Sequence, residues 1–230
     1  MHPFCEQKCS VVTRPPAPPA ADTGRIPLTR ERVLRAAIAL ADRDGVDAVS
    51  MRRLGAELGV EAMSLYNHVP NKAALLDGIV ETVLNDIDLP KDISDWEACL
   101  REMAQSYRKV AMEHPNIVPL VATRPFNTVA SLRPVEVGFE IFKEAGFDPE
   151  SALHAFRTLA GFVTGYTLAE TGTFFGEAKG EDLLTLEDVP PDDFPRLREV
   201  GAYLETTDHD AEFDFAIDVL ITGLQTKLDN

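Results

Sequence analysis

Apolar residues recur at helical spacing along nearly the whole chain after Thr29, and this pattern limits the folds open to it. Between Thr29 and Gly45 they return every three or four positions, which corresponds to one turn of an α-helix. Similar segments follow up to about residue 228, and no stretch alternates apolar and polar residues as a half-buried strand does. We therefore predict an all-α fold.

Capping residues and helix breakers divide this pattern into separate helices. Thr29, Ser50 and Asn71 are suited to cap the first, second and fourth helices, the fourth spanning about Asn71–Asp88. Ser94-Asp95-Trp96-Glu97 is a capping-box pattern that predicts Ser94 as the cap of a helix ending near His114. Four later helices are predicted over Arg133–Ala145, Pro149–Thr171, Phe194–Leu204 and Ala211–Leu228, with a mobile loop over 172–193.

Charge is distributed unevenly along the 230 residues. The chain has 22 basic and 38 acidic residues, a net charge of −16, which argues against non-specific nucleic-acid binding. Arg25–Leu75, however, holds eight basic and six acidic residues, whereas the chain from Leu76 onward holds twelve basic and thirty acidic ones. Because an acidic body repels DNA, any DNA contact must come from the mildly basic segment.

The first 24 residues are predicted to be a disordered, proline-rich arm because of the run Arg14-Pro15-Pro16-Ala17-Pro18-Pro19. Cys5 and Cys9 with His2 form a weak candidate metal set; an ordinary tail explains them better, so we predict no metal and no cofactor. Three cysteines cannot form a disulfide framework, and neither a secretory signal nor an apolar run of about 20 residues is present. We expect a cytoplasmic protein without a membrane partner.

Motifs of enzymes are missing from the sequence. It contains no Gly-x-Ser-x-Gly, no His-Glu-x-x-His and no phosphate-binding glycine loop, and its five histidines are scattered. We therefore predict no catalytic residues and no enzyme activity.

The segment Ser50–Val69 carries the most informative motif. A short helix, a turn at Gly59 and a second short helix form a helix-turn-helix, in which glycine permits the left-handed backbone of a tight turn. Leu54, Val60 and Leu65 would form its small core. The second helix would then expose apolar and polar side chains suited to base edges, namely Glu61, Ala62, Met63, Ser64 and Asn67. From these residues alone, a helical hairpin without a DNA role remains an alternative.

From Leu28 to Leu76 the chain resembles the DNA-binding domain of the tetracycline-repressor (TetR) family of bacterial transcription regulators. The residues that carry the resemblance are Ala36-Ala37, Leu40, Gly45, Arg52 to Val60, Ser64-Leu65-Tyr66, His68-Val69, Asn71-Lys72 and Leu75-Leu76. Farther on, the sequence is similar to the C-terminal domain of the tetracycline-repressor subgroup, at His114-Pro115, Ala122 to Pro125, Ala145-Gly146-Phe147 and the Gly161 to Glu170 helix. The resemblance implies a three-helix DNA-binding domain at 25–75 and a helical effector-binding and dimerisation domain at 76–230.

The resemblance also implies which residues contact a double-stranded DNA operator. These residues are Arg52, Arg53, Ala62, Met63, Ser64, Tyr66, Asn67, His68 and Lys72. Ala62, Met63 and Ser64 match the base-reading start of the recognition helix, whereas Lys72 lies in a first helical turn, which favours an anionic phosphate. Tetracycline repressors have Gln, Pro and Trp in place of Ala62, Met63 and Asn67, so their operator sequence cannot be transferred. Packing of Tyr66, a turn role for His68 and a solvated arginine pair remain alternatives.

An effector pocket is implied for the second domain. Tetracycline repressors hold the drug and Mg²⁺ with His, Asn and Glu side chains, but this chain has Asp88, Met103, Leu120 and Phe162 at four of those positions. A hard cation needs several oxygen or imidazole ligands, so we predict no tetracycline–Mg²⁺ binding and instead an apolar or aromatic effector. The candidate pocket residues are Met103, Tyr107, Leu120, Thr123, Arg124, Phe126, Phe162, Tyr166 and Glu170. Ordinary core packing, or a structural ion pair for Arg124, is the alternative for each.

The last two predicted helices are candidates for a homodimer interface. Their apolar stripe, formed by Phe213, Ile217, Leu220, Ile221 and Leu224, would pair with a second copy in a four-helix bundle, unless it is buried within its own chain. The whole sequence therefore predicts a ligand-responsive DNA-binding transcriptional regulator. We expect a repressor that a small molecule releases from a palindromic operator. An activator, a co-repressor-dependent regulator or a sensor of a partner protein is the alternative.

Overall fold

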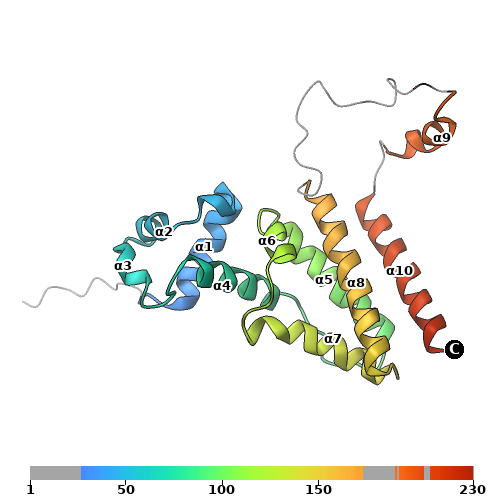
Figure 1. Cartoon of the computed structure of the whole chain (residues 1–230), viewed down its shortest axis with the longest axis horizontal. Coiled ribbons are helices and arrows are strands. Elements are labelled where there is room, and N and C mark those ends of the chain that lie inside the picture. Colours follow the sequence, from blue (N-terminus) through green and yellow to red (C-terminus); the bar gives the residue numbers. More distant parts are fainter. Residues whose placement is uncertain (1–26, 173–189, 191, 205–207, 230) are drawn as a thin grey trace, which may run out of the picture.

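The computed structural model of the protein describes residues 27–172, 190, 192–204 and 208–229. Within these residues every regular element is a helix, so the predicted all-α fold is confirmed (Figure 1). The predicted arm at 1–24 and most of the predicted loop at 172–193 lie outside the described residues. No helix among the described residues is both long and apolar enough to cross a membrane.

Four helices form the N-terminal part: α1 (Arg30–Asp44), α2 (Met51–Leu58), α3 (Ala62–Leu65) and α4 (Lys72–Asn85). A 3₁₀ turn (Val46–Ala48) connects α1 to α2. The predicted caps are confirmed, because the side chains of Thr29, Ser50 and Asn71 each accept a backbone N–H from the first turn of the helix they precede. The fourth helix ends at Asn85, three residues earlier than predicted.

Ion pairs hold α1 against α4. Arg30 pairs with Glu81 at 2.9 Å, and Arg35 pairs with Asp86 at 2.5 Å. The hydrophobic core beneath them does not end with the DNA-binding segment, since it extends through α4 to Ile87 and includes Ile117 from the second half of the chain. Helix α4 therefore belongs to both parts of the molecule.

In the C-terminal part the structure describes the helices α5 (Trp96–Glu113), α6 (Val118–Thr123), α7 (Arg133–Glu144), α8 (Pro149–Glu170), α9 (Pro195–Leu204) and α10 (His209–Leu228). The cap of α5 differs from the prediction, because the carboxylate of Asp95, not the hydroxyl of Ser94, accepts the N–H of Ala98 at 3.0 Å. A carboxylate is a stronger acceptor at a helix N-terminus. The sequence pattern also missed the short helix α6.

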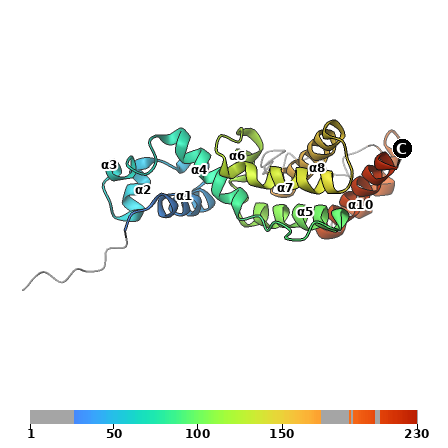
Figure 2. The same cartoon turned by 90° about the horizontal axis from the view of Figure 1, so that it is seen from below.

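Helices α5, α7, α8 and α10 form a bundle that continues from the far end of α4, with α5 and α7 side by side (Figure 2). Helix α6 contacts both α4 and α8, so it lies where the two parts of the molecule meet. This arrangement places the start of α4 at the small N-terminal part and its end at the bundle.

For three of its five residues, the predicted role of the apolar stripe on α10 in the dimer is wrong. Phe213, Ile217 and Ile221 are at most 2% exposed, because α10 packs against α5 and α8, whose own apolar faces this stripe covers. For these three residues the alternative of burial within the chain is correct, whereas Leu220 and Leu224 are half-buried against the same core. The exposed side of α10 carries Phe215 and Val219, which are 69% and 54% exposed.

Candidate DNA-binding surface and effector cavity

Two glycines shape the turn between α2 and α3. Gly59 ends α2 with a left-handed φ of +65°, as the sequence predicts. Gly55 lies inside α2, and a Cβ there would lie 2.8 Å from the carbonyl oxygen of Val60 and 3.2 Å from the amide nitrogen of Ala62. The missing side chain of Gly55 thus lets α3 approach α2 closely. A glycine in a helix interior was the sequence signal for this contact.

A small core fixes α3 below its outer face. Leu54 and Leu65 are fully buried and Val60 packs against them, so the predicted core is confirmed. Ala62 is half-buried and contacts the same core. One of the three residues that the family resemblance assigns to base reading is therefore partly used for packing.

The outer face of α3 and the following turn gather the remaining predicted DNA contacts. Met63 is 74% exposed and Tyr66 43%, so Tyr66 is not a packed core aromatic. Asn67 and Lys72 are exposed, while Ser64 and His68 are half-buried. Lys72 is the first residue of α4, where the positive end of the helix favours an anion.

The two predicted arginines of α2 differ in their surroundings. Arg53 pairs with Asp44, which also pairs with Arg43, and Arg43 in turn pairs with Glu57. Arg52 is exposed, and the described part of the chain offers its guanidinium no carboxylate partner. Arg52 is therefore the more available cation for a phosphate, whereas Arg53 would first have to leave Asp44.

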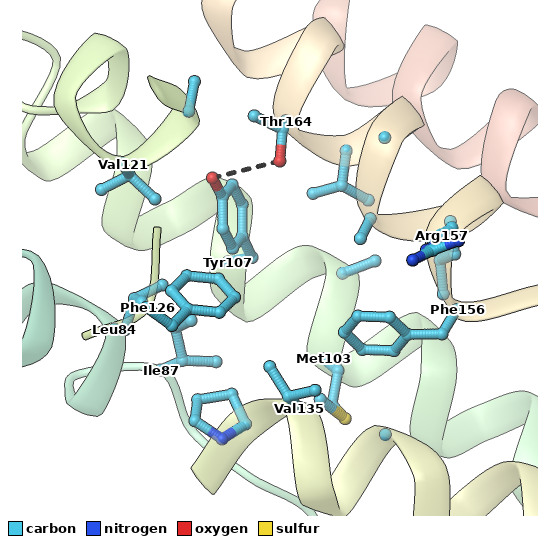
Figure 3. A pocket seen from close by; sticks show the side chains of 18 of the residues that line it. Leu84, Ile87, Met103, Tyr107, Val121, Phe126, Val135, Phe156, Arg157 and Thr164 are labelled. Atoms are coloured by element: carbon cyan, nitrogen blue, oxygen red, sulfur yellow. Dashed lines mark hydrogen bonds between the residues drawn. The ribbon is translucent and has the colours of Figure 1, made fainter. Parts of the chain in front are cut away.

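A cavity of about 570 Å³ opens between the end of α4 and helices α5, α6, α7 and α8. Its wall is mainly apolar, and the rings of Tyr107, Phe126 and Phe156 border it together with Met103 and Val135 (Figure 3). Both its size and its lining are typical of a site for a small molecule.

Four of the nine predicted effector residues line this cavity: Met103, Tyr107, Arg124 and Phe126. The structure places the other five elsewhere: Leu120, Thr123, Phe162, Tyr166 and Glu170. Leu120 packs against the N-terminal core, and the hydroxyl of Thr123 donates to the carbonyl of Pro119 at 2.7 Å on the outside of α6.

Three of the five misplaced residues share the face of α8 that contacts α10. Phe162 packs on Phe213 with ring centroids 5.9 Å apart, and the hydroxyl of Tyr166 donates to the carbonyl of His209 at 3.1 Å. Burial and nearby carboxylates raise the pKa of Tyr166 to about 12. Glu170 accepts two hydrogen bonds from Arg108, at 2.6 and 2.8 Å. This face is therefore occupied by packing and an ion pair.

The adjacent face of α8 lines the cavity instead, and sequence reasoning missed it. Arg157, Ala160, Gly161 and Thr164 recur there at helical spacing and point to the open space. A Cβ at Gly161 would meet nothing within 4 Å, so this small residue enlarges the cavity. Small residues within a long apolar helix were the available signal.

Few polar groups reach the cavity. The hydroxyls of Tyr107 and Thr164 lie 3.4 Å apart, and burial raises the pKa of Tyr107, so its phenol stays neutral. Arg124, just after α6, donates to the carboxylate of Asp77 on α4 at 2.6 and 2.8 Å and to the carbonyl of Ala73 at 3.3 Å. One wall of the cavity is thereby bonded to the helix that begins at the DNA-binding surface.

A second polar contact joins the two parts of the molecule near the end of α1. His114 Nδ1 lies 2.9 Å from a carboxylate oxygen of Asp42, and the side-chain amide of Asn116 donates to the carbonyls of Ala41 and Asp42. The end of α5 is thus bonded to the end of α1.

Two family models cover most of the chain. The model described as bacterial regulatory proteins, tetR family, matches residues 33–79, and the model described as tetracyclin repressor-like, C-terminal domain, matches residues 89–228. The chain belongs to the tetracycline-repressor family. This member of the family is therefore a ligand-responsive, DNA-binding transcriptional regulator, and the family resemblance predicted from the sequence is confirmed.

Known relatives agree with this assignment. The class D tetracycline repressor of Escherichia coli is 30% identical over 209 residues, which cover 87% of this chain and 91% of that protein. The transcriptional repressor DrrR1 of Streptomyces coeruleorubidus is 33% identical over 153 residues, covering 63% of this chain and 57% of DrrR1. Among solved structures, ActR of Streptomyces coelicolor in complex with actinorhodin is 27% identical with a TM-score of 0.75, covering 89% of this chain and all of ActR.

Proposed function

We propose that the protein is a cytoplasmic, homodimeric repressor that binds a near-palindromic operator and leaves it when an apolar or aromatic compound occupies the cavity. The observation that supports this most directly is the course of α4. Its first residue, Lys72, belongs to the candidate DNA-binding surface, and Leu84 near its end belongs to the cavity wall. A ligand in the cavity therefore touches the same rigid element that adjoins the DNA.

DNA binding is proposed to use the exposed side chains of α3 and its neighbours. Met63, Ser64 and Asn67 would face base edges in the major groove, while Arg52 and Lys72 would contact phosphates. Two copies related by a twofold axis would place their α3 helices in successive grooves, about 34 Å apart.

Transmission between the two sites is proposed to pass through α4 and Arg124. At 1.5 Å per residue, the 14 residues of α4 extend about 21 Å. A ligand that moves Arg124 disturbs its bonds to Asp77 and thereby the position of α4. A coupling free energy of about 1–3 kcal/mol is enough to weaken DNA binding by about 5- to 150-fold.

The homodimer is proposed to form through the outer side of α10. Phe215 and Val219 are large, exposed and one turn apart, so they leave an apolar strip on a helix whose other side is already packed. Pairing this strip with that of a second copy gives a four-helix bundle with α8.

The central test starts from genomic DNA fragments that the purified protein retains, which are sequenced to find its operator. Fluorescence anisotropy at low ionic strength then measures operator affinity with and without compounds related to the products of the adjacent genes. We expect such a compound to weaken binding at least fivefold. A compound that tightens binding would support the activator or co-repressor alternative, and a monomer indifferent to every fragment would refute the proposal.

The proposed transmission has its own test in Asp77→Asn. This change removes the carboxylate that holds Arg124 but replaces no residue of the cavity lining or of α3. We expect the ligand to bind as before while its effect on operator affinity falls below fivefold. The matched control is Asp218→Asn, which removes the partner of Arg101 on the bundle and should leave the coupling unchanged. Equal coupling in both variants would exclude Asp77 from the path.

We also propose that the protein does not bind tetracycline with Mg²⁺. Glu170, the one remaining acidic residue of the tetracycline-repressor pattern, is held by Arg108, and Leu120 packs in the core. Titration with tetracycline and Mg²⁺ tests this, and micromolar affinity would contradict it.

A further inference from the structure

One charged residue in the cavity wall has no partner among the residues that the structure describes. Among the described residues that line the cavity, Arg124 and Arg157 are the two charged ones, and none is acidic. The charge of Arg124 is compensated by Asp77. Arg157 forms no ion pair or hydrogen bond with any residue that the structure describes, and its guanidinium points toward the open space (Figure 3).

The neighbours of Arg157 on α8 offer its guanidinium no carboxylate. The positions three and four residues away hold Leu153, His154, Ala160 and Gly161, none of which carries a carboxylate. Ala160 and Gly161 are also small, so the side of the guanidinium that faces the cavity stays open.

Among the described residues, Arg157 differs from most arginines of this acidic chain. Most other described arginines find a carboxylate, as do Arg30, Arg35, Arg43, Arg53, Arg101, Arg108, Arg124 and Arg196. With a net charge of −16, acidic partners are plentiful. No acidic residue of the described lining reaches Arg157, which leaves a cation beside an apolar space.

We propose that the effector carries a carboxylate that pairs with Arg157, attached to an aromatic or polycyclic body that fills the apolar part of the cavity. A planar guanidinium can bind a carboxylate through two parallel hydrogen bonds. Met103, Phe126 and Phe156 would contact the rings, and the hydroxyls of Tyr107 and Thr164 would meet a further oxygen. This proposal rests on the cavity being the effector site.

Two fluorescent compounds of the same ring system test the proposal: anthracene-2-carboxylate and anthracene-2-carboxamide. Their dissociation constants are measured by fluorescence titration of the full chain. Because Arg157 is exposed and its attraction is screened by water, we expect the wild type to prefer the carboxylate by about tenfold rather than more. Arg157→Gln should lose this preference, chiefly by weaker carboxylate binding, and Arg157→Lys should keep part of it.

Control variants separate this proposal from the proposed function. Arg133→Gln removes an exposed arginine that does not line the cavity, so it should keep the tenfold preference. Gly161→Leu fills the cavity and should weaken both compounds. An unchanged preference in Arg157→Gln, or no carboxylate binding by the wild type, would overturn the proposal alone. Undiminished binding of both compounds by Gly161→Leu would overturn it together with the proposed effector site.

Discussion

Replacing Gly55 with alanine should weaken DNA binding while the protein remains folded. The new Cβ would lie 2.8 Å from the Val60 carbonyl oxygen, about 0.6 Å inside ordinary contact, and the atoms it meets are backbone atoms that cannot rotate away. Overpacking of this kind costs about 1–3 kcal/mol. The better helix propensity of alanine offsets up to about 1 kcal/mol of this cost. We therefore expect a net loss of stability of about 1 kcal/mol and a displaced α3.

The loss of operator affinity should exceed the loss of stability. A displaced α3 misaligns its base contacts, each of which contributes about 1–3 kcal/mol of discrimination, so we expect at least a tenfold weaker complex. Anisotropy measures operator affinity, and thermal unfolding confirms that the variant is folded. Gly161→Ala is the control, because a Cβ there meets nothing within 4 Å and should stabilise α8. Wild-type operator affinity in Gly55→Ala would refute the argument that this glycine sets the position of α3.

Two further pairs of variants test the remaining assignments. Phe213→Ala should lower the free energy of unfolding by about 3–5 kcal/mol because its ring is fully buried, whereas Phe215→Ala should raise the dimer dissociation constant. Chemical denaturation measures the first effect and analytical ultracentrifugation the second. Equal losses of stability in the two variants would contradict the assignment. Lys72→Ala should weaken binding to all DNA sequences similarly and reduce the slope of log affinity against log salt concentration by about one. Met63→Ala should instead change the base preference. Gel shifts on operator variants at two salt concentrations distinguish the two effects, and the same sequence and salt dependence in both variants would argue against the proposed docking.

Local rules in the sequence determined the elements of this protein. Helical periodicity predicted the long helices, and the side chains of Thr29, Ser50 and Asn71 predicted three starts because a cap needs only its own helix. Gly59 predicted the turn of the helix-turn-helix for the same local reason. At Ser94 the rule failed by one residue, since an adjacent aspartate competed for the same role.

Only the tertiary structure decided which face of each long helix packs against another helix, lines the cavity or is exposed. Periodicity shows that α8 has apolar residues on all sides. It does not show that Phe162 and Tyr166 face α10 while Arg157 and Gly161 face the cavity. The same holds for α10, where Phe213 is buried and Phe215, two residues later, is exposed. A helix buried on more than one side has several apolar faces, and its partners come from distant parts of the chain. Their arrangement is set by packing, which no local pattern encodes.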